Sequence, residues 1–248
     1  MQKMQEMEIT EMSAENHKEN FQERVYYQVI AYIKSLVKEG KLEFGGKLPS
    51  EREMMERLGL SRNSIREALR TMEHMGLIES RQGKGNFLVN HMGRSLGSVF
   101  SMLIFMKESN YLEVSQLRRA MEAQAFDLTV GKLREEEKEK FREIMGRIQK
   151  SDYQSMVRAD HDFHKMLIEA SGNYLLRMLM DALSHVSQEE ISIILENTTR
   201  EREEWWDAIH NRIYHCLMEG QREEGLAAIE EHYNWIDQRL AQLQVGCE

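Results

Sequence analysis

The sequence predicts a mainly α-helical protein: a small N-terminal domain of three helices and a β-hairpin, then an antiparallel bundle of about seven helices. Two observations support this prediction. A single proline in 248 residues leaves long stretches without a helix breaker. From about residue 91 onward, apolar residues recur at helical spacing over long segments, whereas residues 21–90 alternate short periodic segments with glycine-rich turns.

The composition is that of a globular protein, with 41% hydrophobic and 30% charged residues. The sequence contains no run of about 18 apolar residues, so we expect no membrane-spanning helix. The net charge of −9 would disfavour a nucleic-acid partner, but the charge is unevenly distributed. Residues 21–91 carry 12 Lys and Arg against 9 Asp and Glu, whereas residues 92–248 carry 19 against 28. The positive surplus therefore lies in the N-terminal domain.

The N-terminal domain begins with an amphipathic helix predicted over residues 21–39. A short second helix starts at a capping box, in which the Ser50 hydroxyl and the Glu53 carboxylate each accept from the other residue's backbone N–H. This helix ends near Gly59, because glycine readily takes the left-handed conformation. Ser61 caps a third helix.

A β-hairpin follows the third helix. Residues 77–80 and 86–89 are predicted strands, and the glycines between them permit a tight turn. The order helix, helix, turn, helix, hairpin predicts a winged helix-turn-helix.

The C-terminal part is predicted to contain seven amphipathic helices with short connections. Their predicted spans are 94–108, 111–131, 134–149, 152–171, 174–196, 199–219 and 222–243. The domains are predicted as a disordered lead (1–20), the winged domain (21–90), a linker (91–95) and the helical domain (96–245).

The start of the third helix carries the residue types that read DNA. In a helix-turn-helix, the N-terminal residues of the second helix of the motif enter the major groove. Arg62 and Arg66 share one helical face, and each can donate two hydrogen bonds to guanine, while Asn63 suits adenine. Ser61 and Ser64 could hold phosphates at the helix N-terminus. Further contacts are predicted for Arg52 with a backbone phosphate, and for Gln82 and Lys84 of the wing with the minor groove.

Four segments of this domain closely resemble the GntR superfamily of regulators. They are Lys47 to Glu53, Gly59 to Leu69, Gly76 to Ile78 and Gly83 to Gly85. The resemblance implies a double-stranded DNA partner. It places the family's DNA contacts on Arg52, Ser61, Arg62, Asn63, Arg66 and Gly83.

Histidines and a carboxylate in the helical domain have spacing that suits a metal site. Asp160 and His164 are four residues apart on one helical face, and His210 and His232 lie on two later predicted helices. If these helices pack together, three imidazoles and one carboxylate converge, a set that suits zinc, nickel or another divalent first-row metal. Spacing alone leaves open that these histidines are ordinary core or surface residues.

The same residues resemble the FCD ligand-binding domain of the FadR subfamily. The resemblance includes the Asp160-x-x-x-His164 pattern and the two later histidines. The segments Leu117 to Glu122, before this pattern, and Glu169 to Asn173, after it, also match the family. The resemblance implies a divalent metal held by Asp160, His164, His210 and His232. It also implies that Arg118 clamps the carboxylate of an effector, with Asn173 as a further polar contact.

The sequence therefore predicts a homodimeric transcription repressor that binds a pseudo-palindromic operator and is controlled by a small carboxylate metabolite. The two cysteines, Cys216 and Cys247, lack metal-type spacing and suit the reducing cytoplasm. A metal-dependent hydrolase with a DNA-binding appendage is the alternative, although no further carboxylate is clearly placed as a general base. A purely architectural DNA binder is a third possibility.

Overall fold

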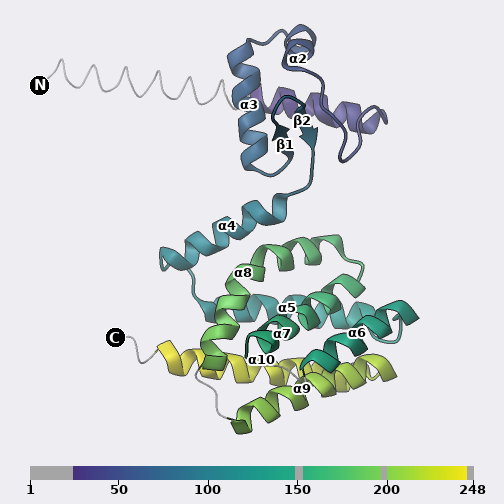
Figure 1. Ribbon diagram of the computed structural model, residues 1–248, viewed down its shortest axis with the longest axis vertical. Coiled ribbons are helices and arrows are strands. Elements are labelled where there is room, and N and C mark those ends of the chain that lie inside the picture. The colour runs from purple at the N-terminus through teal and green to yellow at the C-terminus, as the bar shows by residue number, and fades with distance from the viewer. Residues whose placement is uncertain (1–24, 149–152, 197–199, 245–248) are drawn as a thin grey trace, which may run out of the picture. The chain divides into compact units, whose positions relative to one another are not determined.

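The computed structural model describes residues 25–148, 153–196 and 200–244 (Figure 1). The chain divides into two compact units, Met1–Ser95 and Leu96–Glu248. Each unit has its own cluster of buried apolar side chains. Residues 1–20, predicted as a disordered lead, lie outside the described residues.

The N-terminal unit is a winged helix-turn-helix, as predicted. Its elements are a helix over residues 25–38, α2 (Glu51–Leu58), α3 (Arg62–His74), β1 (Ile78–Arg81) and β2 (Gly85–Leu88). The two strands pair antiparallel, with Ile78 opposite Leu88. Lys47 bridges to Phe87, so the segment before α2 runs beside the hairpin.

Local hydrogen bonds explain where α2 and α3 begin and end. The backbone N–H of Ser50 donates to the Glu53 carboxylate (2.7 Å), and the backbone N–H of Glu53 donates to the Ser50 hydroxyl (3.3 Å). This is the predicted capping box. Gly59 closes α2 at a φ of +66°, a conformation that costs glycine little. At α3, the Ser61 hydroxyl accepts from the backbone N–H of Ser64 (3.2 Å).

Most of the predicted linker at residues 91–95 is helical, because α4 (Met92–Phe105) begins within it. The His91 carbonyl accepts from the backbone N–H groups of Arg94 (3.0 Å) and Ser95 (3.4 Å), which starts the helix. The Ser95 hydroxyl also donates to the His74 carbonyl (2.9 Å) at the end of α3. These hydrogen bonds place the start of α4 at Met92, two residues before the predicted start of this helix at residue 94.

Within the described residues, the C-terminal part contains the seven helices that the sequence predicts. They are α4, α5 (Tyr111–Thr129), α6 (Glu135–Ile148), α7 (Tyr153–Ala170), α8 (Tyr174–Glu196), α9 (Arg200–Glu219) and α10 (Arg222–Gln244). Every boundary lies within three residues of its predicted position. Within the described part of the chain, no helix has the length and apolar character needed to cross a membrane.

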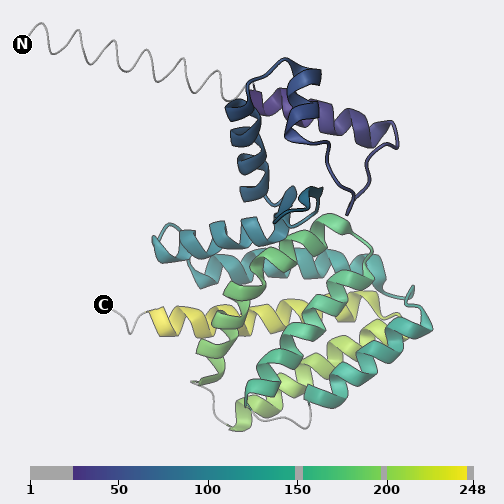
Figure 2. The ribbon, with the colours of Figure 1, turned by 45° about the horizontal axis from the view of Figure 1, so that its top comes forward.

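Helices α5 and α10 lie side by side and antiparallel in both views (Figures 1 and 2). Helix α7 packs against α5, α6 and α8, and α9 packs against α10. The core between them holds large side chains that are almost fully buried: Phe126, Phe141, Phe163, Trp206 and Tyr233. This packing brings one face of α5, α7, α8, α9 and α10 together in the interior.

Candidate functional site

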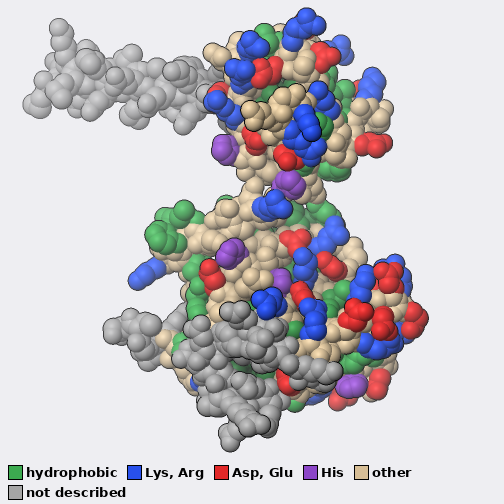
Figure 3. All heavy atoms as spheres, viewed as in Figure 1, with side chains coloured by type: hydrophobic (Ala, Val, Ile, Leu, Met, Phe, Trp, Pro, Cys, Tyr) green, Lys and Arg blue, Asp and Glu red, His purple; other side chains and the backbone are tan. Residues whose placement is uncertain are grey.

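The first turn of α3 presents polar side chains to solvent. Ile65 and Leu69 bury the inner face of the helix, which leaves Arg62, Asn63 and Arg66 exposed. Figure 3 shows lysine and arginine side chains spread over the visible face of this unit. The first turn of α3 is thus exposed to solvent, and its entry into the major groove stays a prediction.

Both arginines share one carboxylate, that of Glu51 at the start of α2. Nε of Arg66 donates to Oε1 and Oε2 of Glu51 (2.9 and 3.0 Å), and Nε of Arg62 donates to Oε2 (3.3 Å). Burial would raise the pKa of Glu51, but the hydrogen bonds from Arg66 and Arg62 outweigh it and lower the pKa. Glu51 therefore holds the two guanidinium groups together as an anion.

The other predicted DNA contacts lie on α2, at the start of α3 and in the turn between β1 and β2. Arg52 is exposed on α2, where its Nε lies 3.8 Å from Glu56. Gln82, Gly83 and Lys84 form the exposed tip of the wing, and Gly83 adopts a φ of +69°. Ser61 and Ser64 are joined by a 2.8 Å hydrogen bond between their hydroxyl groups, so both already serve the α3 N-terminus.

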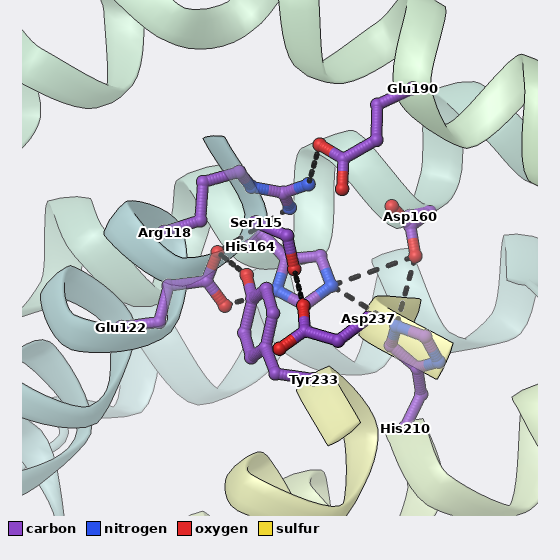
Figure 4. Close-up of polar contacts among 9 residues, drawn as sticks. All are labelled: Ser115, Arg118, Glu122, Asp160, His164, Glu190, His210, Tyr233 and Asp237. Carbon is purple, nitrogen blue, oxygen red and sulfur yellow. Dashed lines mark hydrogen bonds and ion pairs between the residues drawn. The ribbon is translucent and has the colours of Figure 1, made fainter. Parts of the chain in front are cut away.

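Three histidines converge in the interior of the C-terminal unit, as predicted. His164 of α7, His210 of α9 and His232 of α10 each offer a ring nitrogen, and these three atoms lie within 4.8 Å of one another. All three side chains are at most 1% exposed. Asp160 lies beside them, with Oδ1 3.0 Å from Nε2 of His210 and 3.5 Å from Nε2 of His164 (Figure 4).

Hydrogen bonds at Nδ1 orient two of these imidazoles. Nδ1 of His210 lies 2.7 Å from the backbone carbonyl of Trp206, which can only accept a hydrogen bond. Nδ1 of His164 donates to the carboxylate of Glu122. Both rings therefore direct Nε2 inward, and these two atoms are 3.2 Å apart. Metal-ligating histidines are typically fixed in this way by a carbonyl or carboxylate.

His232 has no hydrogen-bond partner on either ring nitrogen among the described residues. Burial and the neighbouring His210 and His164 hold its pKa well below the usual value, so the ring stays neutral. Burying an imidazole without a hydrogen-bond partner costs free energy unless another species binds its ring nitrogens. The ring nitrogens and the adjacent Asp160 carboxylate form a donor set that a divalent ion fits.

The carboxylates in this cluster favour a positive charge on His164. Burial disfavours the charged form of His164, but the carboxylates of Glu122 and Asp160 outweigh it and raise its pKa to about 9. The same pairing with His164 and His210 holds the pKa of Asp160 well below its usual value, although burial acts in the opposite direction. The cluster is thus compatible with positive charge at its centre.

Comparison with known proteins decides the family. The family model "Bacterial regulatory proteins, gntR family" matches residues 25–88, and the FCD domain model matches residues 113–234. The "Putative L-lactate dehydrogenase operon regulatory protein" of Escherichia coli (strain K12) is 30% identical over 172 residues, covering 68% of this chain and 67% of the relative. The chain belongs to the GntR family.

Other relatives of this GntR-family protein agree with the assignment. The HTH-type transcriptional regulator LutR of Bacillus subtilis is 29% identical over 219 residues, covering 83% of this chain and 96% of the relative. A solved structure titled Streptococcus agalactiae GntR has a TM-score of 0.68 at 24% identity, covers 86% of this chain and 99% of that chain, and supports the fold. These relatives and both matched domains indicate a transcription regulator, and nothing in them supports the hydrolase alternative.

The structure adds three residues that we did not single out in the sequence. Glu122 of α5 fixes His164 and also accepts from the Tyr233 hydroxyl (2.6 Å). Glu190 of α8 lies 3.6 Å from Arg118, measured from Oε2 to Nη1. A partial signal was present, because Glu122 is four residues after Arg118 and Tyr233 directly follows His232.

Arg118 and Asn173 were both predicted to contact an effector, and the structure treats them differently. Arg118 is 1% exposed and joins the cluster through Glu122, 3.4 Å from Nη2. Asn173 instead accepts from the backbone N–H groups of Leu175 (3.0 Å) and Leu176 (3.3 Å), so its carbonyl caps α8. Asn173 makes no contact with the cluster among the described residues.

Proposed function

We propose that this GntR-family regulator is a repressor whose operator affinity is controlled by a small carboxylate metabolite bound at a metal site in its FCD domain. The observation that supports this most is His232, a buried imidazole without a hydrogen-bond partner among the described residues, beside two histidines that already point inward. Because protein groups leave the hydrogen-bonding capacity of this imidazole unsatisfied, the cluster fits a binding site better than a purely structural core.

In this proposal, Asp160, His164, His210 and His232 hold one divalent ion, with zinc or nickel as the first candidates. When bound, the ion supplies a positive charge to which a carboxylate can coordinate. Arg118 is the second anchor, because its Nε and Nη1 have no hydrogen-bond partner in the described structure. The name of the Escherichia coli relative mentions an L-lactate dehydrogenase operon, so we include lactate among the first acids to test.

For DNA recognition, we assign base contacts to Arg62, Asn63 and Arg66. Phosphate and wing contacts are assigned to Arg52, Ser61, Ser64, Gln82, Gly83 and Lys84. We place the protein in the cytoplasm, where its DNA target lies. The effector lowers operator affinity if it binds more tightly to a conformation that fits DNA poorly.

We further propose a homodimer on a pseudo-palindromic operator, since two recognition helices can then occupy successive major grooves. Helix α4 supports this proposal, because Val99, Met102 and Phe105 are 53%, 53% and 83% exposed. Hydrophobic side chains gather visibly at the end of α4 in Figure 3. Exposed apolar patches often mark interaction surfaces.

Sedimentation velocity of the full-length protein tests the dimer. We expect wild type to sediment as a dimer, and Phe105→Glu to shift toward monomer because it places a charge in the apolar surface. Phe44→Glu changes another exposed phenylalanine, in the N-terminal unit (69% exposed), and should stay dimeric. A dimer unaffected by Phe105→Glu would remove α4 from the interface.

Metal analysis combined with DNA binding tests the sensing site. His210→Ala should lose stoichiometric metal and its response to organic acids, yet still bind a palindromic duplex selected from a random library by the wild type. His215→Ala is the matched control, because His215 is exposed on the same helix. Stoichiometric metal in dialysed His210→Ala protein would show that the ligand set is wrong.

A further inference from the structure

Glu190 is a buried carboxylate that the proposed metal site does not use. Its side chain is fully buried on α8, and neither oxygen has a hydrogen-bond partner among the described residues. Its nearest cationic atom, Nη1 of Arg118, is 3.6 Å away, which is too far for a good hydrogen bond. Figure 4 shows one oxygen directed at Arg118 and the other directed between Arg118 and Asp160.

Further unsatisfied polar atoms accompany Glu190. Nε and Nη1 of Arg118 have no hydrogen-bond partner in the described part of the chain. The same holds for the hydroxyl of Ser187, which is 2% exposed and lies one turn earlier on the same face of α8. Burying such groups without hydrogen bonds is unfavourable, so native proteins satisfy nearly all of them. A guest molecule that brings both donors and acceptors would satisfy this group of side chains.

The chemistry of the unpaired atoms defines that guest. Arg118 offers donors, which suit a carboxylate, whereas the ionised form of Glu190 offers only acceptors and needs a donor. A hydroxyl group donates to Glu190 and can still accept from Ser187 or Arg118. An ammonium group can only donate, so it would leave one of these donors unpaired.

We propose that Glu190 is a specificity-determining residue that accepts a hydrogen bond from a hydroxyl group of the effector, so that the site selects hydroxycarboxylates over carboxylates lacking that group. This inference rests on the proposed function, because it assumes a carboxylate effector anchored at the metal and Arg118. It goes beyond that proposal by assigning a second recognition group and the chemical class that it selects.

Calorimetric titration of metal-loaded, full-length protein with matched acids tests the proposal. L-Lactate and propionate differ only in one hydroxyl group, as do L-malate and succinate, and L-alanine replaces the hydroxyl of lactate with ammonium. We expect the hydroxy acid of at least one pair to bind about tenfold more tightly or better than its partner, because a buried acceptor left unpaired penalises the analogue. L-Alanine should bind more weakly than L-lactate.

Variants of α8 assign the preference to Glu190. Glu190→Met should reduce the preference to about twofold or less while keeping metal content, because methionine fills the space without accepting a strong hydrogen bond. Glu190→Gln keeps an uncharged acceptor and should show an intermediate preference, which decides the matter if Glu190→Met does not fold. The exposed neighbour Glu189→Gln should behave as wild type.

The outcomes separate this inference from the function on which it rests. Equal binding of hydroxy acid and partner in both pairs, or a full preference retained in both Glu190 variants, would overturn the role of Glu190 and leave the carboxylate site intact. Tighter binding of L-alanine than L-lactate would overturn the selection of hydroxyl over ammonium. Absence of binding by every acid would contradict the carboxylate effector itself, and this inference with it.

Discussion

The protein uses arginine–carboxylate pairing in two opposite environments. On the N-terminal unit, Arg62 and Arg66 share Glu51 at the surface, with side chains 67% and 53% exposed. In the C-terminal unit, Arg118 lies between Glu122 and Glu190, and all three side chains are at most 2% exposed. The residue types are the same, but water reaches only the first cluster.

This difference in solvent exposure determines which arginines can exchange a carboxylate for another partner. An exposed ion pair is worth little, since water and salt compete for both charges, so a DNA phosphate or base edge can replace Glu51 at small cost. A buried arginine cannot lose its carboxylates without leaving charge in a medium of low polarity. Arg118 is therefore fixed between its carboxylates, whereas Arg62 and Arg66 can exchange Glu51 for another partner at small cost.

The largest expected effect comes from removing the buried cation. Arg118→Leu should lower the free energy of unfolding of the C-terminal unit by about 3–5 kcal/mol, because it leaves Glu122 and Glu190 buried without their partner. Arg119→Leu, next to it and 22% exposed, should cost about 1 kcal/mol. Thermal or urea unfolding measures both. Equal losses of unfolding free energy in the two variants would contradict the proposed difference between buried and partly exposed arginines.

A smaller effect is expected at the exposed arginines, and it should appear in DNA binding rather than stability. Arg62→Ala or Arg66→Ala should each weaken binding to a selected operator by about 1–3 kcal/mol, the usual value of a bidentate base contact. Arg70→Ala, on the same helix but paired with Glu67, should change affinity by less than about threefold. Fluorescence anisotropy at one fixed salt concentration gives these values. Similar losses for all three arginines would indicate charge alone, without base readout.

The smallest effect is expected from the shared carboxylate. Glu51→Gln should change the free energy of unfolding by less than about 1 kcal/mol, since its pairs are exposed. It should raise affinity for random-sequence duplex about threefold, because two arginines no longer have a competing anion. Titrations with operator and random duplex measure discrimination, which should fall. Weaker binding to both duplexes would mean that Glu51 positions the arginines for contact instead of competing with DNA.

The sequence was most informative where structure depends on neighbours along the chain. Ser50, Glu53 and Gly59 mark the ends of α2 through bonds that span only three or four residues, and the structure contains those bonds. Helical periodicity likewise located the seven helices of the C-terminal part. The hairpin was also predicted, although each strand lies one residue from its expected position.

Contacts between distant helices were harder to predict. Whether Glu51 meets Arg66 depends on the angle between α2 and α3, which periodicity does not encode. Glu190 interrupts an apolar row with Val186 and Ile194 at four-residue spacing. That position signals a buried acid, but the partner on α5 becomes apparent only in the folded unit. The convergence of three histidines was inferred from family resemblance more than from spacing.

The positions of the histidines along the chain have a consequence for biosynthesis. The third imidazole lies on α10, the last helix among the described residues, so the proposed ion site cannot form before α10 has been synthesised. The winged unit is complete more than a hundred residues earlier and forms a separate compact body. Each nascent chain can therefore fold its winged unit before the proposed metal site exists.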